Sequence, residues 1–243
     1  HLAGGLSLAD GIAAVVRGGN AAAARAGVEA RYICTALRSH SLELAVAAAE
    51  TASTFRDRGL VGFDLAGREE RYPDPLVFAR AFEAARAGGL RITTHAGEWG
   101  GAAQVRRALA IEPERIAHGP GAIDDPSLVA ELVERGVTLD LCPTSNVQAG
   151  IVPSVAAHPL RRLRAAGVSV TLSTDALTVA DTTLPQEYLR AVTEIGLTLP
   201  ELWATNRRAL EVAFADEPTR RRLSAEFDAW GAGFAELREG APA

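Results

Sequence analysis

Two histidines, a glutamate and an aspartate follow short apolar runs of the chain. His95 and Glu98 lie in Thr94–Glu98 (T-H-A-G-E), His118 belongs to R-I-A-H-G, and Asp175 closes S-T-D. A neutral imidazole and a carboxylate are good ligands for Zn²⁺, and a further polar group can act on a water molecule that the metal activates. These residue types therefore indicate a hydrolytic metal site.

The spacing within T-H-A-G-E allows two different roles. His95 can coordinate a metal ion, while Glu98, three residues later and beyond a glycine, can stand over the same pocket as a proton donor. His118 can either orient the activated water or remove its proton. The alternative for Glu98 is a carboxylate that interacts with the dipole of the following helix, and the alternative for each histidine is a hydrogen-bonded structural group.

The apolar runs before these residues are predicted to be strands of a parallel sheet. Their nearly continuous hydrophobicity is typical of parallel strands that are covered on both faces. Longer Ala-, Leu- and Arg-rich stretches alternate with them, as in repeated βα units. The six predicted strands are Val28–Leu37, Leu60–Ala66, Leu90–His95, Arg115–His118, Val137–Cys142 and Val168–Thr174.

Amphipathic periodicity predicts helices between and after these strands. Several of the helices end near Gly, and Pro stands mainly at their first positions, except for Pro159, which is expected to delay the start of its helix. The predicted helices are Ile12–Ala26, Ser41–Arg56, Pro75–Ala87, Ala102–Ala110, Pro126–Arg135, Pro153–Ala166, Leu184–Ile195, Leu199–Ala213 and Glu217–Glu236.

Six βα units with extra C-terminal helices fit a (β/α)8 TIM-type barrel of the α/β class that is incomplete at the N-terminus, because closure needs eight strands. We expect residues 1–243 to form one barrel domain with strands 3 to 8, and the first two strands to lie upstream of His1. Active sites of such barrels are built at the carboxyl ends of the strands. The polar groups expected to converge there are Asp64, His95, Glu98, His118, Pro143–Asn146 and Asp175.

Composition excludes several classes of partner. The net charge is −5 and the arginines are scattered, so we expect no nucleic-acid partner. No apolar run is long enough for a membrane span and no signal peptide is visible, which predicts a cytoplasmic protein without a membrane partner. Cys34 and Cys142 are expected to be reduced, buried thiols. A small-molecule substrate is favoured, and the oligomeric state stays open.

Five strings, in this order, resemble the adenosine deaminase family of the metal-dependent amidohydrolase superfamily. They are F-D-L-A-G-R-E at Phe63–Glu69, T-H-A-G-E at Thr94–Glu98, R-I-A-H-G at Arg115–Gly119, L-C-P-T-S-N at Leu141–Asn146 and S-T-D at Ser173–Asp175. The other zinc deaminase architecture uses H-x-E with P-C-x-x-C, which this chain lacks.

The resemblance implies hydrolytic deamination of adenosine or a related 6-aminopurine. One Zn²⁺ per site would be held by His95, Asp175 and an H-x-H pair from the first strand, and water would attack the purine at C6. Glu98 would protonate the neighbouring ring nitrogen, and His118 and Asp175 would orient the water. Gly67, through its backbone, and Asp64 would bind the purine nucleoside or base.

Two positions depart from the family pattern. The H-x-H pair is absent, and His1 is interpreted as a loop residue near the substrate mouth because Gly4–Leu8 matches the region after the second strand. Two protein ligands are fewer than a catalytic zinc site needs, so the chain by itself is expected to be inactive. Ala176 stands where the family usually has an acidic or amide residue that bonds the five-membered ring, which weakens the case for adenosine itself.

Two other readings remain open: a non-catalytic purine-binding protein, or an amidohydrolase with a different substrate. Several further residues are predicted to be structural. Packing roles are expected for Trp99 and Trp203, surface positions for His40 and His158, structural hydrogen bonds for Asp181–Thr183, and bracing of the rim for Ser145 and Asn146.

Overall fold

The computed structural model describes residues 4–237, so the predicted position of His1 lies outside the described residues. These residues form two compact units. One is the chain up to His95 together with Arg107–Glu114, and the other is Ala96–Arg106 together with the chain from Arg115 onward. Each unit is described by itself, and the single domain expected over residues 1–243 stays a prediction.

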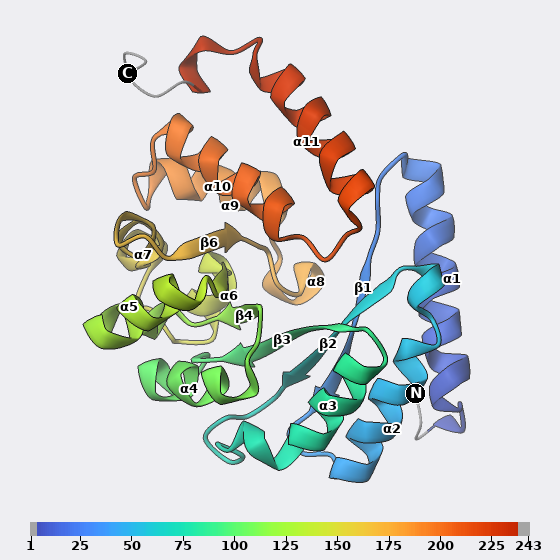
Figure 1. Cartoon of the computed structure of the whole chain (residues 1–243). Helices are drawn as coiled ribbons and strands as arrows, with labels where there is room; N and C mark the ends of the chain where they lie inside the picture. Colours follow the sequence, from blue (N-terminus) through green and yellow to red (C-terminus); the bar gives the residue numbers. More distant parts are fainter. Residues whose placement is uncertain (1–3, 238–243) are drawn as a thin grey trace. The chain divides into compact units, whose positions relative to one another are not determined.

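The first unit is built from alternating strands and helices. Its strands pair in parallel in the order β1-β2-β3, and Thr35 of β1 lies opposite Asp64 of β2. Helices α2 and α3 lie side by side (Figure 1). The elements are α1 (Leu8–Ala26), β1 (Tyr32–Leu37), α2 (Leu42–Ser53), β2 (Leu60–Ala66), α3 (Ala79–Ala87) and β3 (Arg91–Ala96).

The core of this unit contains both small and aromatic side chains. Ala49 and Ala52 of α2 are fully buried, which lets the helix pack closely. Phe63 of β2 and Phe82 of α3 meet edge to face with ring centroids 5.6 Å apart. The core therefore fixes β2, which carries Asp64.

Strand β1 pairs only with β2 among the described residues. Beside it, a groove of about 340 Å³ runs between α1 and β1 and is lined mainly by apolar side chains, including Ile12, Val16 and Ile33. Ile33 and Leu37 of this strand are each 40% exposed. The first unit thus has an open, apolar sheet edge.

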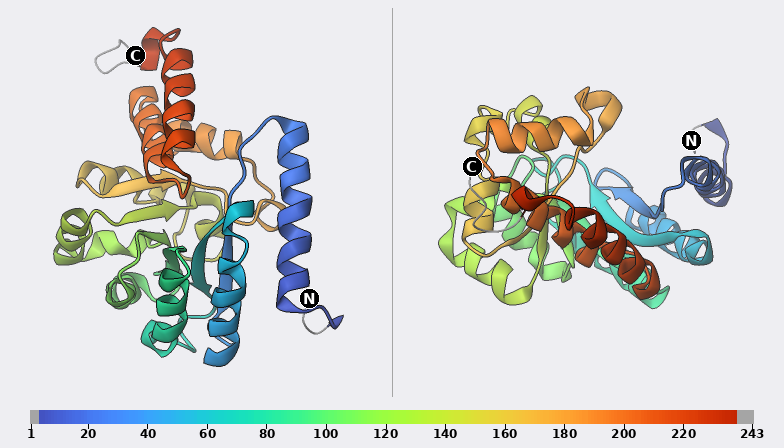
Figure 2. Two further views of the ribbon diagram at one scale, coloured as in Figure 1. Left: turned by 45° about the vertical axis from the view of Figure 1, so that its right-hand side comes forward. Right: turned by 90° about the horizontal axis from the view of Figure 1, so that it is seen from above.

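The second unit repeats the alternation and ends in helices. Its strands pair in parallel in the order β4-β5-β6. Helices α10 and α11 lie side by side (Figures 1 and 2). The elements are α4 (Gly101–Ala108), β4 (Arg115–His118), α5 (Pro126–Arg135), β5 (Thr138–Leu141), α6 (Pro143–Gln148), α7 (Leu160–Ala165), β6 (Ser169–Leu172), α8 (Leu177–Ala180), α9 (Leu184–Thr193), α10 (Leu199–Val212) and α11 (Glu217–Gly231).

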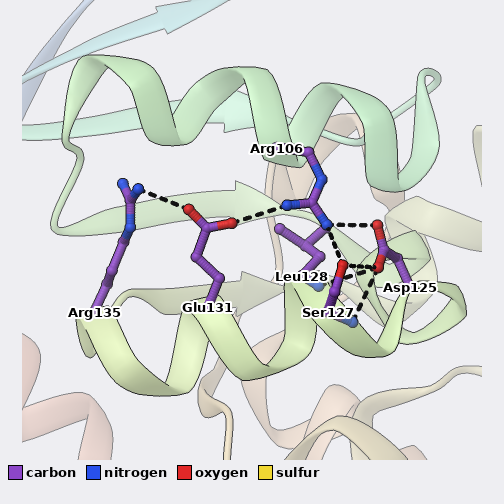
Figure 3. A network of polar contacts seen from close by, with 6 residues as sticks. All are labelled: Arg106, Asp125, Ser127, Leu128, Glu131 and Arg135. Atoms are coloured by element: carbon purple, nitrogen blue, oxygen red, sulfur yellow. Dashed lines mark hydrogen bonds and ion pairs between the residues drawn. The ribbon is translucent and has the colours of Figure 1, made fainter.

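A polar network joins α4 to α5 (Figure 3). Arg106 donates to Asp125 at 2.7 Å and to Glu131 at 2.9 Å. Asp125 also caps α5, and the hydrogen bond from Arg106 holds the pKa of its carboxyl well below the usual range, helped by bonds from Ser127 and the Leu128 amide. The network anchors α4, the helix that follows Glu98.

The six predicted strands and the alternating parallel pattern are confirmed. β1 begins at Tyr32, so the prediction from Val28 was too long, and Pro153–Ala166 shrinks to α7 because Pro159 stands at its N-cap. The short helices α6 and α8 were not predicted, because six and four residues are too few to show a helical periodicity. None of the described helices is long and apolar enough to cross a membrane.

Candidate active site

His95 and Asp64 form a pair at the ends of neighbouring strands in the first unit. His95 Nδ1 lies 2.9 Å from Asp64 Oδ2 and 3.1 Å from Oδ1. Thr35 donates a further hydrogen bond to Oδ2 at 3.0 Å, and Asp64 is only 2% exposed. A carboxylate that holds Nδ1–H of a histidine orients the ring so that a metal ion would bind through Nε2. The predicted contact of Asp64 with substrate stays a prediction.

Arg38 is a buried charged residue next to His95 that the sequence reasoning missed. Its guanidinium is buried at the end of β1 and donates to the backbone oxygens of His95 and Tyr72, each at 3.1 Å. Burial lowers the pKa of Arg38, while the charges of Glu69, Asp64 and Asp74 oppose that shift. Arg38 thus ties the end of β3, where His95 stands, to the loop after β2. Only its place directly after an apolar run could have indicated it.

Gly67 directly follows β2 in the same unit. Its φ is +109°, a backbone conformation that residues other than glycine rarely adopt. Its φ therefore explains why glycine is found here, in a turn directly after a strand end. The predicted backbone contact of Gly67 with a purine stays a prediction.

Glu98 lies in the second unit after a tight turn at Gly97. Gly97 has φ +72°, and a Cβ on it would stand 2.6 Å from Val105 Cγ2. Only glycine fits, which explains the G of T-H-A-G-E. Beyond this turn, Glu98 Oε2 lies 3.9 Å from Nε2 of His118, whose side chain is buried. The structure thus brings these two predicted groups together.

Asp175 follows β6 in the second unit. Its Oδ2 accepts a hydrogen bond from Ser145 Oγ at 2.7 Å, so Ser145 braces the aspartate. Burial and the negative charges of Asp175, Asp140, Glu187 and Glu98 raise the pKa of the Cys142 thiol well above its usual value. Asp175, Glu98 and Cys142 all belong to the second unit.

Two of these residues hold unusual backbone conformations. His118 has φ +69° and Asp175 has φ +59°, both in the left-handed region. Such residues cost on the order of 1–3 kcal/mol each and cluster at functional sites. Strain at the end of β4 and directly after β6 supports a functional role for both residues.

His158 corrects one prediction. It was expected at the surface, but only 4% of it is exposed. Its Nε2 lies 3.1 Å from Asn146 Oδ1, and Asn146 Nδ2 lies 3.0 Å from His118 Nδ1. The prediction failed because the ring contacts Asn146 of α6, which lies 12 residues earlier in the sequence. Bracing by Asn146 is confirmed, and His40 is exposed as predicted.

Glu187 of α9 is a second buried group that the sequence reasoning missed. It accepts from Thr182 Oγ1 at 2.9 Å and from the Thr144 amide at 3.3 Å, and it is fully buried. Arg190 donates to Thr144 Oγ1. This cluster ties the loop after β6 to the first turn of α6 and confirms the structural hydrogen bonds expected around Thr182.

The aromatic and thiol predictions have mixed outcomes. Trp203 packs as expected, stacked on Phe227 with centroids 4.0 Å apart, whereas Trp99 is 43% exposed. Both cysteines are unpaired; Cys142 is buried and Cys34 is only partly so.

The donors present fit zinc in type and not in number. A histidine oriented by a carboxylate and an aspartate braced by a serine are suitable ligands. Within residues 4–237, however, no group of three or more His, Cys, Asp or Glu is arranged to hold a metal ion. His95 and Asp175 also belong to different units. Further ligands are needed to complete a catalytic site.

Comparisons with known proteins agree with these observations. The adenine deaminase of Sinorhizobium medicae is 46% identical over 217 residues, which cover 89% of this chain and 66% of the relative. That of Rhizobium meliloti is 43% identical over 217 residues, with the same coverage of 89% and 66%. The chain thus spans slightly less than two thirds of the length of these curated relatives.

Solved structures give the same fold. The crystal structure of adenine deaminase from Arthrobacter aurescens matches 96% of this chain and 71% of its own, with a TM-score of 0.87 and 27% identity. An amidohydrolase from Burkholderia ambifaria with bound Zn matches 94% of this chain and 65% of its own, with a TM-score of 0.85 and 27% identity. The fold is therefore that of the amidohydrolase TIM barrels over part of their length.

The sequence model of the family described as adenosine deaminase matches residues 1–230, nearly the whole chain. The motifs, the strand-end placement of the polar groups and the fold all lie within this match. The chain therefore belongs to the adenosine deaminase family.

Proposed function

We propose that the protein to which this chain belongs is a zinc-dependent hydrolase that deaminates a 6-aminopurine. Water adds to C6, the C6–NH₂ bond breaks, and the 6-oxopurine and ammonia are released. The observation that carries the proposal lies in the second unit, where Glu98 follows β3, His118 ends β4 and Asp175 follows β6, and the last two hold strained backbone conformations. Family membership supports the reaction class.

His95 and Asp175 would hold the zinc ion together with ligands from the part of the protein that this chain does not include. Zinc, when bound, lowers the pKa of water and so supplies a nucleophile near neutral pH. Asp64 keeps the His95 ring in one orientation, and Ser145 does the same for the Asp175 carboxylate. Both arrangements reduce the reorganisation needed on metal binding.

Glu98 would protonate the purine ring nitrogen beside C6. Glu98 lies between the turn at Gly97 and the start of α4, and the buried His118 imidazole stands 3.9 Å away. Protonation makes C6 more electrophilic, while His118 and Asp175 orient the attacking water. Gly67 and Asp64 would contact the purine.

Adenine is the favoured substrate. The relatives that resemble the chain are named adenine deaminases, and Ala176 cannot donate or accept the side-chain hydrogen bond expected for adenosine. Adenosine is the second candidate.

The decisive experiment uses the full-length protein. We expect about one zinc ion per chain by metal analysis and release of ammonia from adenine in a panel that includes adenosine, other aminopurines and aminopyrimidines. Protein without zinc and without turnover of any purine would overturn the proposal and favour a non-catalytic purine-binding protein. Hydrolysis of another ring alone would favour a different amidohydrolase.

Glu98→Gln tests the proton donor. The amide cannot deliver the proton, so we expect kcat to fall at least a hundredfold while the zinc content stays unchanged. Glu134→Gln, an exposed change on α5, is the matched control and should keep normal activity. A Glu98→Gln enzyme with most of its activity would refute the assigned role.

A further inference from the structure

Three buried side chains of the second unit form a continuous hydrogen-bonded chain that ends at His118. The Leu160 amide donates to His158 Nδ1 at 3.2 Å, His158 Nε2 contacts Asn146 Oδ1 at 3.1 Å, and Asn146 Nδ2 contacts His118 Nδ1 at 3.0 Å. The exposed fractions are 4% for His158, 0% for Asn146 and 1% for His118. The chain is therefore shielded from bulk water.

The donor and acceptor of every bond in this chain follow from the Leu160 amide, which can only donate. A backbone N–H can only donate, so the Leu160 amide makes His158 Nδ1 an acceptor. A neutral His158 then carries its proton on Nε2 and donates to Asn146, which must present its oxygen. The Asn146 amide nitrogen is left to donate to His118 Nδ1. That nitrogen is an acceptor, so a neutral His118 carries its proton on Nε2.

We propose that His158 and Asn146 are positioning residues that fix the neutral His118 ring in its Nε2–H tautomer. Without His158, the Asn146 amide could turn over, present its oxygen to His118 and stabilise the opposite tautomer. His158 thus acts on His118 through Asn146 and does not touch the reacting atoms itself. The role of this arrangement in catalysis rests on the proposed function, whereas the tautomer of His118 is independent of that function.

The hydrogen-bonded chain of His158, Asn146 and His118 is called the relay below, and its surroundings support this assignment. Burial lowers the pKa of His158 from 6.5 to about 4, so the ring is neutral near pH 7 and has one N–H to place. The backbone of Asn146 is held as well, because its amide donates to the Cys142 oxygen at 2.8 Å and its oxygen accepts from Ile151 at 2.9 Å. The side chain therefore starts from a fixed position.

The tautomer decides what His118 can do. Its Nε2 is the ring atom that lies 3.9 Å from Glu98 Oε2. With the proton on this atom, the neutral ring acts as a donor toward the rim. Of the two roles open to His118, orientation of water by donation is then the one the relay supports.

Nitrogen NMR measures the tautomer directly, without zinc or substrate. The 243-residue chain is labelled with ¹⁵N at its 5 histidines, and long-range ¹H–¹⁵N spectra are recorded near pH 7, with His118→Gln used for assignment. We expect His118 Nδ1 at the shift of an unprotonated nitrogen and Nε2 at that of a protonated one. A His118 ring with its proton on Nδ1 would overturn the proposal.

Variants of His158 test the relay. His158→Phe removes the donor to Asn146, so we expect the His118 signals to shift toward the Nδ1–H form. His158→Gln restores a donor amide at similar reach and should recover the original pattern. His40→Phe, at an exposed histidine, is the matched control and should change nothing. An unchanged His118 tautomer in folded His158→Phe would contradict the relay, and the wild-type spectrum remains decisive if this variant does not fold.

Kinetics of the full-length enzyme separate positioning from mere structural support. We expect His158→Phe to lower kcat at least tenfold with KM within about twofold, and His158→Gln to recover most of that loss. Equal losses in both variants would contradict a positioning role. If the protein shows no deamination at all while the NMR tautomer is as expected, the proposed function fails and the relay stands.

Discussion

His118 and Asp175 illustrate at the scale of single residues how the site is held. Both have positive φ, and each is fixed by one neighbouring polar side chain, Asn146 or Ser145. A strained backbone with a braced side chain keeps little freedom, so the groups are preorganised for one geometry. Substitutions at the bracing residues should therefore reduce catalysis more than they reduce binding.

Ala176 tests which purine is bound. It is exposed and stands at the N-cap of α8, a position that favours aspartate, so Ala176→Asp should not destabilise the protein. One restored hydrogen bond contributes about 1 kcal/mol, so we expect KM for adenosine to fall roughly fivefold in the full-length enzyme. Val179→Asp, on the same helix and 83% exposed, controls for the added charge. An unchanged or higher KM would argue that adenosine is not the natural ligand.

His158 should make stability depend on pH. Its pKa is about 4 in the folded state and about 6.5 when unfolded, so the unfolded chain binds the proton first as the pH falls. The contribution is fully present above about pH 6.5 and is lost between there and pH 4. We expect the free energy of unfolding in urea to fall by roughly 2 kcal/mol more in wild type than in His158→Gln between pH 7.5 and 5. Equal pH dependence in the two proteins, with His40→Gln as control, would refute this.

At the scale of elements, the site depends on short helices that follow the strands. α6 carries Ser145 and Asn146, and its first turn is tied to α9 by the buried Glu187 carboxylate. A helix of this length has little intrinsic stability, so tertiary contacts decide its position. The C-terminal helices are thus part of the support of the site.

Removal of the Glu187 carboxylate should loosen this support. Glu187→Ala leaves Thr182 and the Thr144 amide without their buried acceptor, so we expect the free energy of unfolding to fall by about 3 kcal/mol in urea titrations. Glu187→Gln keeps an acceptor and should lose less. Glu134→Ala, at an exposed site, should lie within about 0.5 kcal/mol of wild type. A Glu187→Ala protein as stable as this control would show that the hydrogen bonds of Glu187 contribute little to the free energy of unfolding.

At the scale of the whole molecule, the open edge of β1 is the main feature. Strand β1 is followed by α2 and then by β2, which pairs beside it. By the same pattern, a strand that precedes α1 would pair with the other edge of β1. About a third of the length of the curated relatives also lies outside the matched region, since the match covers 66% of the relative. We therefore expect an upstream strand to fill the groove between α1 and β1 in the longer protein.

Hydrogen exchange can test this expectation. Alternate amides of β1 face away from β2, so they should exchange rapidly in the 243-residue chain and become protected in the longer protein. Amides of β2, which has strand partners on both sides, serve as the internal control. If protection in β1 is the same in both proteins, the groove is not the place of that strand.

The sequence by itself determined the order of strands and helices and the positions of the polar groups that end the strands. Continuous apolar runs can only be buried strands here, and residues that follow them must lie at the carboxyl edge of a parallel sheet. Asp64, His95, Glu98, His118 and Asp175 were found in this way. The signal is local, which is why it could be read without a structure.

Only the tertiary structure decided which side chains hold those groups. Asp64 reaches His95 from 31 residues away, Asn146 reaches His118 from 28, and Glu187 reaches Thr144 from 43. His158 was predicted to be a surface residue because its contact with Asn146, 12 residues earlier, leaves no local sequence pattern. Burial and hydrogen-bond partners are set by packing between elements, and no local pattern records them.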